Sequence, residues 1–71
     1  MNEDLTDFQQ KLVDLVRGNP SGVHQEELIR ACDGKSPALV TYELRHLCNE
    51  KEVLHSVGDD GNRTFFLISE S

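Results

Sequence analysis

Polar and basic side chains recur at helical spacing in the segment that follows Ser36. At about 100° per residue, four of them, together with one alanine, fall within a sector of roughly 100° on one side of a helix. These five are Ala38, Thr41, Tyr42, Arg45 and Asn49. The sector contains no carboxylate, because Glu43 and Glu50 project to its flanks. Hydroxyl, amide and guanidinium groups can bond to base edges and phosphates, so this is a candidate nucleic-acid surface, and a solvated polar helix face is the open alternative.

Arg45 is the best single candidate in this sector. A guanidinium group matches guanine edges and phosphates bidentately, whereas a surface arginine paired with a carboxylate is the structural alternative. Tyr42 could stack on a base or donate to a phosphate, or it could lie at the edge of the core with its hydroxyl in water.

Histidine and cysteine could supply metal ligands or a nucleophile, and the chain has three of the first and two of the second. His24, Cys32, His46, Cys48 and His55 form no CxxC or HxxxH pair. The two cysteines fall among apolar residues, which predicts reduced, half-buried thiols. We therefore expect no metal site, no cofactor and no catalytic residue, and a chain this short has little room for an enzyme cleft.

Three clusters of Gly, Pro, Ser and Asp divide the chain into four segments. The first three predict helices over residues 5–17, 24–32 and 36–51. Thr6 with Gln9 forms a capping box for the first helix, His24 caps the second, and Ser36 followed by proline begins the third. The fourth segment is β-branched and aromatic on both sides of a Gly/Asp/Asn tract, which predicts a β-hairpin over residues 53–68.

The apolar stripes of these elements predict the core. We expect it to contain Phe8, Leu12, Leu15, Val16, Leu28, Val40, Leu44, Leu47, Leu54, Phe66 and one of Leu67 and Ile68. Only one of the last two can point inward, because side chains alternate along a strand.

Length and charge limit the function further. With 71 residues the chain predicts a single domain over residues 1–71. A net charge of −6 argues against indiscriminate attraction to phosphate or to anionic membranes. The N-terminal residues lack the basic and apolar regions of a signal peptide, and the longest apolar run is four residues, Phe65 to Ile68, so we expect no membrane span and a cytoplasmic protein.

Residues 36–54 resemble the winged helix-turn-helix family of small bacterial and archaeal regulators, and the resemblance extends over nearly the whole chain, from Leu5 to Ile68. The recurring feature is two leucines three apart, then Glu-Lys and an apolar pair, here Leu44, Leu47, Glu50, Lys51, Val53 and Leu54. Many members of the family place glycine just before the apolar pair, where this chain has Glu52, so we expect a different turn there.

The resemblance implies an α+β fold, a three-helix cluster followed by a two-stranded hairpin wing, to which Gly22 and Val23 could add a minimal first strand. It also implies a transcription regulator that binds duplex DNA with its third helix in the major groove and its wing on the backbone. The DNA-binding residues would then be Ser36, Ala38, Thr41, Tyr42, Arg45, Asn49, Asn62 and Arg63.

Two features bear on the choice of partner. Asp59 and Asp60 lie at the expected wing tip, where they should repel DNA at short range. The net charge favours the alternative function, a winged helix that docks on a larger protein such as an enzyme or a chromosome or replication complex. A homodimer is compatible with either function, because one module alone buries little DNA surface.

Overall fold

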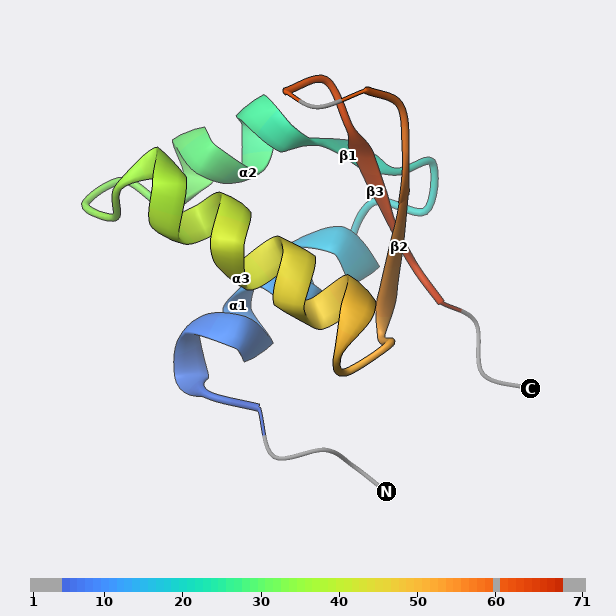
Figure 1. Ribbon diagram of the computed structural model, residues 1–71, viewed down its shortest axis with the longest axis horizontal. Coiled ribbons are helices and arrows are strands. Elements are labelled where there is room, and N and C mark those ends of the chain that lie inside the picture. The colour runs from blue at the N-terminus through green and yellow to red at the C-terminus, as the bar shows by residue number, and fades with distance from the viewer. Residues whose placement is uncertain (1–4, 60, 69–71) are drawn as a thin grey trace.

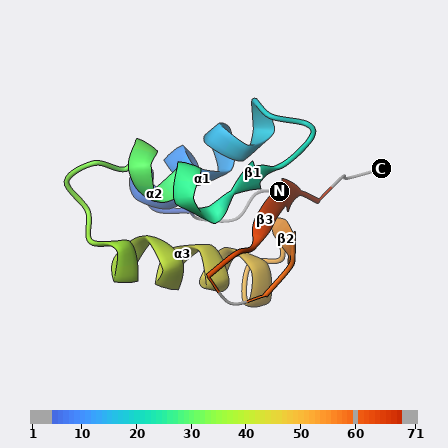
Figure 2. The ribbon, with the colours of Figure 1, turned by 90° about the horizontal axis from the view of Figure 1, so that it is seen from above.

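The computed structural model describes residues 5–59 and 61–68, which form three helices and a three-stranded antiparallel sheet. Helix α3 lies on one side of the molecule, α1 and α2 lie on the other, and the sheet closes one end (Figures 1 and 2). The fold is thus a small α+β domain.

Helix α1 spans Asp7–Arg17 and begins where the capping box was predicted. The Thr6 hydroxyl accepts from the Gln9 amide at 3.1 Å, and the Gln9 side chain accepts from the Thr6 amide at 3.0 Å. The helix therefore begins two residues after the predicted start at Leu5, because Thr6 takes the extended conformation of a cap. Gly18 caps its C-terminus.

Helix α2 spans Gln25–Ala31, with His24 as its cap. The imidazole Nδ1 accepts from the Glu26 amide at 3.1 Å, which confirms the prediction that His24 caps this helix. The Glu27 carboxylate lies 3.5 Å from Arg30 in an exposed ion pair.

Helix α3 spans Pro37–Asn49, and the Ser36 hydroxyl accepts from the Leu39 amide at 3.1 Å, so the predicted start is confirmed. The helix ends two residues before the predicted end at Lys51. The regular ladder of helical hydrogen bonds ends there, because the Glu50 and Lys51 amides both donate to the His46 carbonyl, at 2.8 and 3.1 Å. Glu52, between the helix and the next strand, has a φ of 57°. Glu52 thus has the left-handed conformation that favours glycine.

The sheet contains β1 (Val23–His24), β2 (Leu54–Val57) and β3 (Thr64–Leu67) in the order β1-β3-β2. The predicted hairpin is present, with Ser56 opposite Phe65. The sheet has three strands instead of the two of a simple wing, because Val23 also pairs with Phe65 from the other side.

The core joins all three helices to the sheet. Its buried apolar residues are Leu12, Val13, Val16, Val23, Leu28, Cys32, Val40, Leu44, Leu47, Leu54 and Phe65. Phe8, Leu15 and Leu67 are partly buried and pack against this cluster, so Leu67 is the inward residue of the pair that the sequence left open.

Two core predictions were wrong. Phe65, 4% exposed, is the buried phenylalanine of β3, whereas Phe66 points to the other face of the sheet and stacks on His55 with 5.1 Å between ring centroids. The alternation of side chains along a strand requires this once Leu67 faces the helices. Cys32 is fully buried where a half-buried thiol was expected, and Cys48 is half-buried as expected.

Candidate nucleic-acid interface

The outer face of α3 carries the polar sector found in the sequence. Tyr42, Arg45 and Asn49 are exposed there, and Thr41 is half-buried. Tyr42 is 63% exposed and stacks on His46 at 6.3 Å between ring centroids, so its ring lies outside the core.

The carboxylate of Glu43 is held away from this face. Its Oε1 accepts a hydrogen bond of 2.8 Å from the side-chain nitrogen of Gln9, a buried residue of α1. The same Gln9 side chain completes the capping box of α1, so one residue both starts that helix and fixes the Glu43 carboxylate. Glu50 remains near the outer face, where it lines a shallow hollow together with Tyr42, Arg45, His46 and Asn49.

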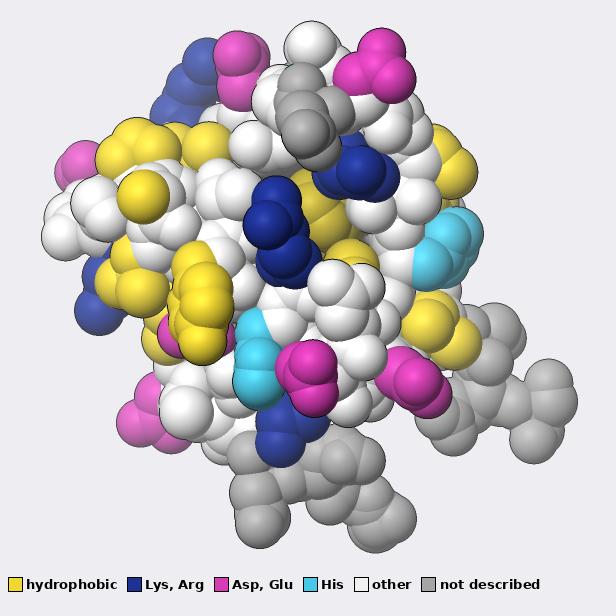
Figure 3. Space-filling view, in the orientation of Figure 1, with side chains coloured by type: hydrophobic (Ala, Val, Ile, Leu, Met, Phe, Trp, Pro, Cys, Tyr) yellow, Lys and Arg dark blue, Asp and Glu magenta, His cyan; other side chains and the backbone are white. Residues whose placement is uncertain are grey.

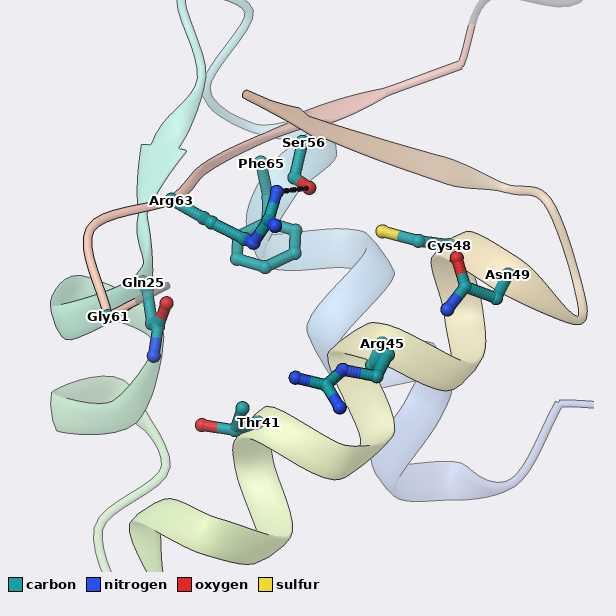
Figure 4. A pocket seen from close by; sticks show the side chains of 9 residues that line it. All are labelled: Gln25, Thr41, Arg45, Cys48, Asn49, Ser56, Gly61, Arg63 and Phe65. Atoms are coloured by element: carbon teal, nitrogen blue, oxygen red, sulfur yellow. Dashed lines mark hydrogen bonds between the residues drawn. The ribbon is translucent and has the colours of Figure 1, made fainter. Parts of the chain in front are cut away.

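A second hollow lies between α3 and the β2–β3 hairpin, and we call it the notch. Its volume is about 330 Å³. Its lining residues are Gln25, Thr41, Arg45, Cys48, Asn49, Ser56, Gly61, Arg63 and Phe65. Figure 4 shows Thr41, Arg45 and Asn49 extending from α3, with Arg63 and Ser56 on the opposite side. Among these described residues none carries a carboxylate.

Arg63, just before β3, is held by the neighbouring strand. Its Nη1 donates to the Ser56 hydroxyl at 3.2 Å, which orients the guanidinium over the notch (Figure 4). In the orientation of Figure 1, the space-filling view shows basic side chains at the centre of the face that α3 and the hairpin form, with acidic side chains outside that centre (Figure 3). On this face the described charged side chains are therefore unevenly distributed.

Burial raises the pKa of the Cys48 thiol above its ordinary value of 9.0, although the positive charge of Arg63 and a hydrogen bond with Ser56 act in the opposite direction. Since burial is the largest cause, the thiol is protonated and uncharged near neutral pH. Cys48 therefore adds no negative charge to the notch.

The structure brings four of the predicted site residues together in the notch: Thr41, Arg45, Asn49 and Arg63. The other four lie elsewhere. Tyr42 contributes to the neighbouring hollow, and the hydroxyl of Ser36 is used to cap α3. Ala38 and Asn62 are exposed and line neither hollow.

The hairpin tip is only partly covered by the structure. Asp59 is exposed, and the amide of Asn62 donates to its carbonyl at 2.9 Å, which closes the turn. Asp60, the second acidic residue expected there, lies outside the described residues.

Sequence reasoning missed the remaining lining residues of the notch, which are Gln25, Cys48, Ser56, Gly61 and Phe65. Cys48 was assigned to core packing alone, but it also faces the notch. Ser56 could have been predicted as a candidate, because it lies between Leu54 and Val57 on a predicted strand, and polar side chains on strands face solvent or a site. The other three come together only through the tertiary fold.

Three further observations concern metal ligands, the cysteine thiols and membrane-spanning helices. Within residues 5–59 and 61–68, no three His, Cys, Asp or Glu side chains are grouped so that they could hold a metal ion. Both cysteines are free thiols. No helix in the part of the chain that the structure describes is long and apolar enough to cross a membrane.

Comparisons of the chain with protein-family models, with curated proteins and with solved structures found no match. The residues of the α3 face and of the notch are therefore the basis for inferring a function.

Proposed function

We propose that this chain binds duplex DNA through α3 and the β2–β3 hairpin, as a small cytoplasmic transcription regulator or accessory factor with a winged-helix arrangement. Helix α3 would lie in the major groove, which is wide enough for one α-helix, and the hairpin would lie on the adjacent backbone. The observation that carries the proposal is that Arg45 and Arg63 line the same notch from opposite sides, and that its described lining residues include no carboxylate.

The charge distribution supports this proposal despite the net charge of −6. Charges separated by more than about 10 Å are largely screened at 0.1 M salt, so binding depends on the groups nearest the DNA. On α3 the groups that face the notch are Arg45, Thr41 and Asn49. The Glu43 carboxylate is bound to Gln9, and the exposed Glu50 lies at the edge of this face. The expected contacts are thus one guanidinium and several neutral hydrogen-bonding groups on the helix.

The proposal is tested by a pair of charge reversals. Arg45→Glu places a carboxylate on the α3 face, whereas Arg17→Glu makes the same change on α1, where Arg17 is exposed and paired with Asp14 at 2.7 Å. Fluorescence anisotropy with a mixed-sequence duplex at low salt should show at least a tenfold loss of affinity for Arg45→Glu, about the cost of one lost contact. The control should change affinity less than about threefold.

The two variants must also melt within a few degrees of the parent protein, since both sites are exposed. Equal losses of affinity for both variants would mean that only the overall charge matters, and the α3 interface would then be wrong.

A second candidate function is docking on a larger protein, and two exposed residues favour it. Tyr42 is 63% and Leu39 36% exposed, and they are three residues apart on α3, hence on the same side of that helix. A protein partner could cover both side chains. The observation that would select this function is the absence of saturable duplex binding at low salt, together with a partner complex that persists at salt concentrations that dissociate electrostatic complexes.

A further inference from the structure

The notch has a volume suited to part of a small ligand. Its 330 Å³ lies at the lower end of the range for ligand pockets and would hold about ten water molecules. We infer that the notch binds a phosphate group between Arg45 and Arg63, with space for part of an attached sugar. The group could come from the DNA backbone or from a free nucleotide. Only the DNA case rests on the proposed function.

The charges of the notch favour a phosphate. Arg45 extends from α3 and Arg63 from the residue just before β3, so two guanidinium groups face the same hollow from different walls (Figure 4). Each keeps its positive charge at physiological pH whatever else it contacts. The Cys48 thiol beside them is uncharged near neutral pH, because burial raises its pKa. The described lining residues therefore include two guanidinium groups and no carboxylate.

The geometry of the walls also fits an oxyanion. The Ser56 hydroxyl accepts from Arg63 at 3.2 Å and fixes the position of that guanidinium before a ligand arrives. Thr41 and Asn49 add hydroxyl and amide donors from α3. Phe65, 4% exposed, adds apolar surface to the lining. The guanidinium held by Ser56 is thus positioned for a charge-assisted hydrogen bond to an oxyanion.

The two sources of phosphate predict different behaviour. A backbone phosphate would occupy the notch only while α3 and the hairpin lie on a duplex, whereas adenosine monophosphate would bind alone and compete with the duplex. Adenosine, which lacks the phosphate, is the matched control ligand, and sodium chloride at the same ionic strength is the control for bulk screening.

The experiment uses the full chain labelled with ¹⁵N and follows amide shifts while adenosine monophosphate, adenosine or sodium chloride is added. If the phosphate comes from a free nucleotide, we expect saturable shifts at Cys48, Ser56 and Arg63 with the nucleotide alone. If it comes from the DNA backbone, we expect the same shifts only when a duplex is added. Arg45→Gln should weaken nucleotide binding about tenfold, the usual effect of losing a hydrogen bond to a charged group. The control Arg17→Gln removes an equal charge from α1 and should leave nucleotide affinity unchanged.

The role of Ser56 is tested separately as that of a positioning residue. Ser56→Ala should weaken nucleotide binding by about threefold while the melting midpoint stays within a few degrees, and Ser56→Thr, which keeps the hydroxyl, should restore it. A loss that Thr does not restore would contradict the positioning role.

Several results would overturn the inference. Equal shifts with adenosine and with the nucleotide, or with the nucleotide and sodium chloride, would show that the phosphate is not recognised. A duplex that shifts α3 but leaves Cys48 and Ser56 unchanged, without nucleotide binding, would refute the notch as a phosphate site and leave DNA binding intact. Nucleotide binding without duplex binding would support the inference and refute the proposed function.

Discussion

Leu44 lies at the centre of α3, and its truncation tests whether that helix packs in the register described. The side chain is 0% exposed and belongs to the cluster that joins the helices to the sheet. Leu44→Ala removes its outer carbon atoms and leaves a cavity, and such changes typically lower the free energy of unfolding by 2–5 kcal/mol.

The expected loss of stability can be expressed as a shift of the melting temperature. For 71 residues, the entropy of unfolding near the midpoint is about 0.15 kcal/mol per degree. A loss of about 3 kcal/mol therefore lowers the melting temperature by about 20 °C. A domain of this size has a stability of only a few kcal/mol, so a largely unfolded variant at 37 °C is within the expected range.

The assay is thermal melting followed by circular dichroism at 222 nm, with Leu39→Ala as the matched control. Leu39 is on the same helix but is 36% exposed, so its truncation should cost less than about 1 kcal/mol. A Leu44→Ala midpoint within about 3 °C of the parent protein, or equal to that of Leu39→Ala, would refute the register of α3.

Three further predictions concern two turns and the half-buried thiol of Cys48. Glu52→Gly should raise the free energy of unfolding in urea by about 0.5–1 kcal/mol, because Glu52 has a φ of 57°, and a decrease would contradict the strain argument. Gly22→Ala should lower it by more than about 1 kcal/mol, since φ is 99° and the new Cβ would lie 2.5 Å from the Phe66 ring; an unchanged midpoint would show that this turn adapts. Burial raises the pKa of Cys48 above 9.0, so below that pH iodoacetamide should modify its thiol more slowly in the folded chain than in urea, measured by peptide mass spectrometry. Arg63→Gln should slow the reaction further, because it removes a positive charge that lowers this pKa, and equal rates in the folded and unfolded chain would contradict the effect of burial.

The helix boundaries could be predicted because their causes are local. Thr6 and Ser36 bond to amides three residues further along, and such bonds depend only on the residues of one turn. The polar sector of α3 was equally predictable, because the helical repeat alone places Arg45 and Asn49 on one side.

The features that were not predicted depend on contacts between distant segments. Phe65 and Phe66 are adjacent and equally apolar, so the sequence could not say which faces the helices. That choice follows from the pairing of β3 with both β1 and β2. The notch is also formed by distant segments, since Gln25, Arg45 and Arg63 are far apart in the sequence and meet only in the folded chain.

Titration of the ¹⁵N-labelled chain with a mixed-sequence DNA duplex at low salt tests the central claim most directly. The proposed interface predicts saturable amide shifts on residues 38–49 and 61–63, with little change on α1 (Asp7–Arg17). Raising the salt should reverse these shifts, since neutralisation of phosphates by arginine releases counterions. The absence of saturable shifts on α3 and on the hairpin, or shifts concentrated on α1, would contradict the proposal that α3 and the hairpin form a DNA-binding surface.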